Sequence, residues 1–221
     1  APRSAPHQAS ARARAEELRK RALDLMRKAN RSGLSQAAAK LQESARLFES
    51  VRLNEAAAAD YLSLGEIYST RGEFKRALSR YHLAWSLSKD SSPDLSCLAL
   101  SSMAITEVTA GELPQASQHA DQAMACGADS HNPRVKAQAM EARGLGLMYT
   151  KDSTSALKLF QSTADLLRDT PEVDMLASVT LFAGLAYFQN GNTNRALEKE
   201  NGALGLGQSG GTIAGAAKAQ A

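Results

Sequence analysis

Hydrophobic and polar positions alternate along most of this chain with the period of an amphipathic helix. Ala77, Tyr81 and Ala84, for example, recur at i, i+4 and i+7, which places all three on one face of a helix. Short polar segments containing Gly or Pro interrupt the pattern at intervals. The pattern predicts five consecutive helix–turn–helix pairs, at 12–31 and 34–51, 54–71 and 73–89, 93–110 and 112–127, 133–151 and 153–168, and 173–190 and 192–205.

Small residues recur at equivalent places in these helix pairs. Counterparts of Gly65 occur at Ala104, Gly146 and Gly184, separated by 39, 42 and 38 residues. A period of this length, about 40 residues, indicates an array of stacked repeats. The repeat containing Gly146 is expected to be irregular, because it is two residues shorter at its turn than the repeat containing Gly65.

Each recurring residue type has a structural interpretation. We expect Gly65, Gly146 and Gly184 to lie where the two helices of a pair approach most closely. Three residues after each glycine stands a tyrosine that would fill the adjoining space: Tyr68, Tyr149 and Tyr187. Four further glycines are expected just past the ends of first helices: Gly33, Gly72, Gly111 and Gly191. Because one pair buries only one face, neighbouring pairs must stack to complete a core.

This pattern resembles the tetratricopeptide repeat (TPR). The repeat at 54–89 matches most completely, with Tyr61, Leu64, Gly65, Tyr68, Gly72, Ala77, Tyr81 and Ala84. Other repeats depart from it: Glu107 replaces a tyrosine, and Met26 and Ala29 replace the glycine and tyrosine of the first repeat. The resemblance covers residues 13–204 in a long-period variety, and it implies an all-α, right-handed superhelical solenoid of about five repeats.

The repeats are expected to form one domain over residues 12–205. Residues 1–11, with two prolines and no periodicity, are predicted to be a flexible N-terminal segment. Residues 206–221 are predicted to be a Gly/Ala-rich tail or a truncated next helix. The chain begins at Ala1 and not at Met, which either a cleaved leader or excision from a longer chain would explain.

The resemblance implies a concave groove, lined by the first helices, that holds a peptide or helix of another protein. The implied groove residues are Lys20, Arg27, Arg31, Leu62, Glu66, Thr70, Ser101, Ile105, Val108, Arg143, Leu147, Lys151, Leu181, Leu185 and Phe188. The basic first repeat would suit a partner with an acidic end. For Ile105, Val108 and Phe188 the alternative is packing against neighbouring helices, because apolar residues at helical spacing usually form core.

Sequence motifs for catalysis or metal binding are missing from the chain. None of the four histidines stands four residues from another, and none neighbours a cysteine. The glycines at 205–211 lack the Gly-Lys-Ser/Thr ending of a phosphate loop. We therefore predict no enzyme activity, no catalytic residue, no metal, no cofactor and no small-molecule substrate.

The two cysteines allow two interpretations. Cys97 lies 14 residues before Gly111 and Cys126 lies 15 residues after it, so both fall near the same end of one helix pair. A disulfide between them is sterically feasible and would indicate an oxidising compartment. Two reduced, buried thiols are the default expectation.

The net charge of +3 is unevenly distributed. Residues 1–50 carry 11 Lys and Arg against 5 Asp and Glu, whereas the rest of the chain is net acidic. The basic first repeat could contact nucleic-acid phosphates, although no aromatic stacking platform accompanies it. A membrane span is not expected, because no run of 18 apolar residues occurs.

We therefore predict a soluble protein–protein interaction scaffold or adaptor, either cytoplasmic or exported after removal of a leader. Two alternatives stay open: a regulatory or sensor arm of a larger multidomain enzyme, and nucleic-acid binding through the basic first repeat. The edge faces of the array could also pair two copies of the chain.

Overall fold

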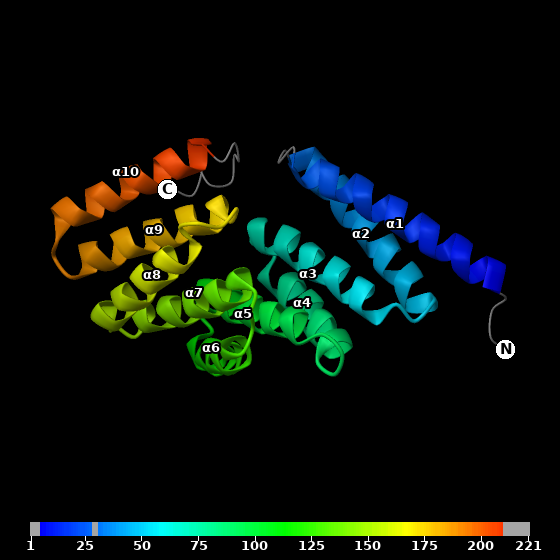
Figure 1. Ribbon diagram of the computed structural model, residues 1–221, viewed down its shortest axis with the longest axis horizontal. Coiled ribbons are helices and arrows are strands. Elements are labelled where there is room, and N and C mark those ends of the chain that lie inside the picture. Colours follow the sequence, from blue (N-terminus) through cyan, green and yellow to red (C-terminus); the bar gives the residue numbers. More distant parts are fainter. Residues whose placement is uncertain (1–4, 28–30, 210–221) are drawn as a thin grey trace. The chain divides into compact units, whose positions relative to one another are not determined.

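The computed structural model describes residues 5–27 and 31–209, with side chains at 8–27 and 32–207 (Figure 1). In these ranges the regular elements are ten α-helices: α1 (Ala5–Arg27), α2 (Arg31–Ser50), α3 (Asn54–Thr70), α4 (Phe74–Ser88), α5 (Pro93–Ala110), α6 (Leu113–Ala128), α7 (Pro133–Tyr149), α8 (Ser153–Leu167), α9 (Val173–Gln189) and α10 (Thr193–Ser209). The predicted all-α fold of five helix–turn–helix pairs is confirmed for this part of the chain.

The first and the last helix extend beyond their predicted outer bounds. Helix α1 begins at Ala5, so the described part of the segment predicted to be flexible is helical, and Ala11 is already buried. Helix α10 continues to Ser209 in spite of its glycines, and Gly207 is buried. In both cases packing against the neighbouring helix, α2 or α9, outweighs weak helix propensity. The rest of the two predicted terminal segments, residues 1–4 and 210–221, lies outside the described ranges.

The chain forms two compact units, Ala1–Ala99 and Leu100–Ala221. In the first unit α1 packs against α2, α2 against α3, and α3 against α4. Its core is rich in alanine, with Leu41, Phe48, Leu64 and Ile67 as its largest fully buried apolar side chains. The single domain over residues 12–205 stays a prediction.

The core of the second unit includes Phe160 of α8. The Phe160 ring lies 5.8 Å from the ring of Phe182 in α9, centroid to centroid. Val108, Leu145, Met148 and Val179 belong to the same buried cluster. Helices α7, α8 and α9 therefore share one core, and α10 packs against α9.

A recurring turn joins the two helices of a pair. Gly72, Gly111 and Gly191 adopt φ values of 72°, 83° and 77°, in the left-handed region that glycine enters without steric cost. These three glycines end first helices as predicted. The prediction for Gly33 is wrong, because Gly33 lies inside the first turn of α2.

Both cysteines are disulfide-bonded in the structure, so the expectation of two reduced thiols is wrong. Cys97 is in α5 and Cys126 is in α6. The spacing of the cysteines on either side of Gly111 had left this alternative open.

Candidate partner-binding surface

Close helix approach at glycine is confirmed for two of the three predicted sites. A Cβ atom on Gly65 would lie 2.3 Å from Cε1 of Tyr81, so only glycine fits between α3 and α4 there. A Cβ atom on Gly184 would lie 3.2 Å from the carbonyl oxygen of Ala196 in α10. Glycine thus marks the crossing point of the helices in both pairs.

In α7 the close glycine is Gly144, and the prediction for Gly146 is wrong. A Cβ atom on Gly144 would lie 2.5 Å from Cε1 of Phe160, whereas nothing lies within 4 Å of one on Gly146. Gly146 instead borders a cavity of about 170 Å³ beside α6. With Gly144 as the reference, the intervals from Gly65 through Ala104 to Gly184 become 39, 40 and 40 residues.

The turn after α7 supports this assignment. Lys151 has a φ of 65° and takes the place that glycine takes in the other turns. The N–H of Asp152 donates to the carbonyl oxygen of Leu147 at 2.9 Å, as Glu73 N–H does to Tyr68. The repeat is therefore of full length, and the irregularity we predicted is absent from it.

Residues of α7 consequently have other neighbours than we predicted. Leu147 takes the position of Tyr68 and packs against the core, whereas Tyr149 is 53% exposed and fills no space between helices. Arg143 pairs with Asp121 of α6 at 3.1 Å and so points toward the preceding pair. In the corrected register the groove positions that the resemblance implies for α7 would be Gln138, Glu141, Leu145, Met148 and Tyr149.

The groove candidates of α5 are mostly buried. Ser101 is fully buried, and Val108 belongs to the core cluster around Phe160. Ile105 is half-buried and packs against the same cluster. Ile105 and Val108 therefore pack against neighbouring helices, which was the alternative to a groove position for these two residues.

Helix α9 differs, because its candidates reach the surface. Leu181 is half-buried, and both Leu185 and Phe188 are exposed. These three residues follow one another at i, i+4 and i+7, so they share one face of α9. Packing therefore does not account for Phe188.

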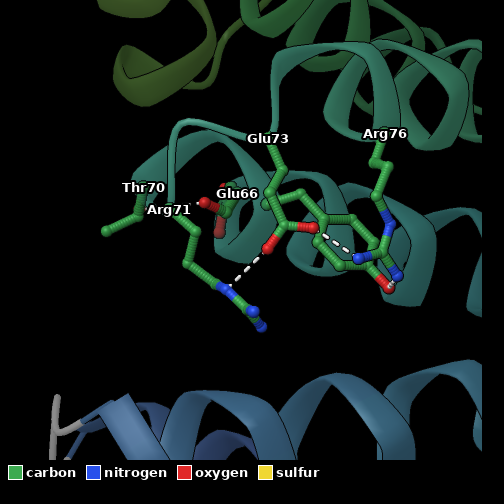
Figure 2. A network of polar contacts seen from close by, with 6 residues as sticks. Glu66, Thr70, Arg71, Glu73 and Arg76 are labelled. Carbon is green, nitrogen blue, oxygen red and sulfur yellow. Dashed lines mark hydrogen bonds and ion pairs between the residues drawn. The ribbon is translucent and has the colours of Figure 1, made fainter.

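The groove candidates of α3 lie at half-buried or exposed positions. Leu62 and Glu66 are half-buried and Thr70 is exposed, with its hydroxyl donating to the carbonyl oxygen of Glu66 at 2.9 Å. Figure 2 shows this bond beside a network at the α3–α4 turn. In that network Glu73 pairs with Arg71 at 2.7 Å and also with Arg76.

Arg76 also makes a pairing that the sequence did not suggest. It lies over the ring of Tyr68, 4.0 Å from its centroid, and donates to the Tyr68 hydroxyl at 2.8 Å. Arg195 and Tyr187 repeat this arrangement in the last pair, with a hydrogen bond of 3.2 Å. Both pairs are eight residues apart, which is the signal that could have revealed them.

The basic residues of α1 are largely neutralised. Lys20 is exposed, and Arg27 pairs with Asp24 at 2.7 Å. Of Arg31 only the backbone, at the start of α2, is described. Every arginine of α1 whose side chain is described pairs with a carboxylate: Arg12 with Glu16, Arg14 with Glu43, Arg19 with Asp60, Arg21 with Glu17, and Arg27 with Asp24.

In one of these pairs the carboxylate, that of Asp60, is buried. Arg19 donates to Asp60 at 2.6 Å and to the carbonyl oxygen of Ala56 at 2.5 Å, and its guanidinium lies 4.4 Å from the ring centroid of Phe48. Burial raises the pKa of Asp60, although hydrogen bonds with Arg19 and Ser44 oppose the shift. The pair joins α1 to α3, so its role is structural.

The second unit has a comparable polar pair. Glu107 occupies the position of Tyr68, is buried, and lies 2.7 Å from Nδ1 of His119 in α6. No cluster of three metal-ligating side chains occurs among the described residues. None of the described helices is long and apolar enough to span a membrane.

Comparison with known proteins identifies the fold. No protein-family model and no curated protein matches the sequence at a significant level. Among solved structures, the chain is similar to TPR-like repeats of a putative kinesin light chain from Podosopora anserina. The identity is 14%, the TM-score is 0.60, and the match covers 92% of this chain and 97% of that chain.

Two Rap proteins are also similar. One was solved in complex with competence and sporulation factor, at 12% identity and a TM-score of 0.71 over 85% of this chain and 53% of that chain. The other, the Rap conjugation gene regulator of plasmid pLS20, was solved with the Phr* peptide, at 13% identity and a TM-score of 0.66 over 80% and 50%. This chain thus spans about half the length of each of these two Rap proteins, and it has the TPR-like helical-repeat fold that the sequence predicted.

Proposed function

We propose that this protein binds another polypeptide, and that the binding surface lies on the second unit around Tyr149, Leu185 and Phe188. One observation carries the proposal. Six large hydrophobic side chains in the described part of the chain are more than a third exposed, and four of them lie on α7, α9 and α10. These three helices contact one another in sequence, α7 with α9 and α9 with α10. Exposed apolar surface that spans neighbouring elements is typical of a binding site.

The fold supports a polypeptide as the ligand. Two structures with this fold hold a factor or a peptide, namely the two Rap complexes. Aromatic side chains such as Phe188 and Tyr149 supply large contact areas at a small cost in conformational entropy. The alternative is a regulatory or sensor arm of a larger multidomain enzyme. The match with the two Rap complexes covers about half of each Rap chain.

Nucleic-acid binding has less support. Binding to phosphates requires cationic groups that are free to replace counterions. The arginines of α1 that have described side chains already pair with carboxylates. Lys20 is the exposed lysine of that helix.

A random-peptide library displayed on phage tests the proposal. Peptides selected on the native chain are titrated against Leu185→Ser and against the matched control Leu83→Ser. These leucines are equally exposed, at 39% and 38%, and Leu83 lies on α4 in the other unit. We expect selected peptides to bind the native chain and Leu83→Ser alike, and Leu185→Ser about tenfold more weakly. Equal binding to all three proteins would contradict the proposed surface.

A further inference from the structure

Exposed residues of the last helix pair occupy positions that are buried in the pair before it. Leu185 and Phe188 of α9 lie 40 residues after Leu145 and Met148 of α7, at equivalent positions of the repeat. Leu145 is 7% exposed and Met148 8%, whereas Leu185 is 39% and Phe188 62% exposed. The residue types are similar, so the difference in exposure comes from the helices that cover these residues.

Helix α9 covers the earlier pair. Leu145 and Met148 share a buried cluster with Val179, Ala183 and Ala186 of α9. On α8, Leu157 packs against this cluster, and its counterpart on α10, Leu197, is 54% exposed. The face formed by Leu185, Phe188 and Leu197 therefore repeats an interface that receives a helix in the preceding pair.

We propose that this α9–α10 face binds an amphipathic helix of a partner polypeptide, in the way that the α7–α8 pair binds α9. The inference rests on the proposed function and names the ligand class. The argument is continuity: similar apolar side chains at the same repeat positions already form a helix-receiving interface one repeat earlier. An extended peptide would leave the spaces between these side chains unfilled, because ridges of one helix pack into the grooves of another.

The buried face of α9 defines the chemistry of the partner helix. Met175, Val179, Phe182, Ala183 and Ala186 all contribute to the core shared with α7 and α8. Their spacing of i, i+4, i+7, i+8 and i+11 is a single helical stripe. The partner helix should carry such a stripe, with small residues in its last two positions, where α9 itself has alanine.

The test uses a synthetic peptide with the sequence of residues 172–190, labelled with fluorescein. The peptide is titrated by fluorescence anisotropy with the native chain, with Leu185→Glu, and with the control Leu83→Glu. A second peptide carries Val179→Asp and Ala183→Asp, which interrupt the apolar stripe. Circular dichroism checks that both protein variants keep the native helical content, as expected for substitutions at exposed positions.

We expect saturable binding of the first peptide to the native chain and to Leu83→Glu, weakened at least about tenfold in Leu185→Glu, and no binding of the second peptide. Equal binding to all three proteins, or no binding of the first peptide, would overturn the inference. If library-selected peptides still require Leu185 in that case, the proposed function stands and only the helical ligand is wrong. A native dimer that Leu185→Glu dissociates, in sedimentation equilibrium, would instead assign the face to a second copy of the chain.

Discussion

Gly144 of α7 and the ring of Phe160 in α8 are in direct contact, with no room for a side chain between them. A Cβ atom at Gly144 would lie 2.5 Å from Cε1 of Phe160. The interval of 16 residues between them equals that between Gly65 and Tyr81. This contact aligns the α7–α8 pair with the other repeats, and the equivalence of Leu145 with Leu185 depends on it.

The first prediction compares two glycines in one helix. Gly144→Ala should destabilise the fold by about 1–3 kcal/mol, because the added methyl group overpacks the contact with Phe160. Gly146→Ala should stabilise it by about 0.5–1 kcal/mol, because alanine favours the helix and the methyl group enters an open cavity. Urea unfolding of the two variants measures both effects. Reversed signs would restore Gly146 as the crossing point and remove the repeat alignment.

The second prediction concerns Lys151. Its φ of 65° lies in the left-handed region, which costs a residue with a side chain about 1–2 kcal/mol. Lys151→Gly should therefore raise the free energy of unfolding by about 0.5–1 kcal/mol, after allowance for the greater freedom of glycine in the unfolded chain. Gly191→Ala is the converse variant and should lower it by a similar amount. A stability loss in Lys151→Gly would show that the lysine side chain makes a contact that matters more than the backbone.

The third prediction concerns the pair of Arg19 and Asp60. Arg19→Met should destabilise the fold by about 2–4 kcal/mol, because the buried carboxylate of Asp60 loses its cationic partner. Adding Asp60→Asn should recover part of that loss. Thermal unfolding of the native chain, the single variant and the double variant makes the comparison. A double variant no more stable than Arg19→Met alone would mean that the loss comes from the packing of Arg19 on Phe48.

The pH dependence of this variant has a defined sign. The pKa of Asp60 is already raised above its usual 3.8 by burial, so the folded state favours the protonated carboxyl. Removing Arg19 should raise this pKa further. The stability contribution of the protonated form is present below pH 3.8 and is lost as the pH rises through the folded-state pKa. Arg19→Met should therefore lose more stability than the native chain between acidic and neutral pH.

The fourth prediction concerns Tyr61. Burial and a hydrogen bond to Glu49, at 2.5 Å, raise the pKa of Tyr61 to about 12 from 10.0. The stability that the neutral phenol contributes is present below pH 10 and is lost as the pH rises through 12. An ultraviolet titration of the tyrosines should show one phenol that ionises at higher pH than the others, and Tyr61→Phe should remove this component. A native titration unchanged by Tyr61→Phe in that range would contradict the assignment.

Much of this fold could be predicted from the sequence, because helical periodicity and turn residues are local signals. The spacing of Ala77, Tyr81 and Ala84 predicted helix α4. The glycines predicted where first helices end, at Gly72, Gly111 and Gly191. The register of α7 was missed because two glycines stand two residues apart there. Only the partner across the helix pair, Phe160, distinguishes Gly144 from Gly146.

The candidate surface was less predictable, because exposure depends on which helix follows. Val108 and Phe188 occupy equivalent repeat positions and are both apolar. Val108 is buried by the helix pair that follows it, whereas no described helix follows α10 to cover Phe188. The charge of α1 was likewise misleading, since the sequence gives the number of arginines and not their carboxylate partners.

Photo-crosslinking tests the central claim most directly. The photoreactive residue p-benzoylphenylalanine replaces Phe188 in one variant and Leu83 in a control, and each is irradiated with the peptides selected on the native chain. We expect covalent adducts of chain and peptide at position 188 and none at position 83. Equal adducts at both positions, or none at 188 while the peptides remain bound, would contradict a polypeptide-binding surface on α9.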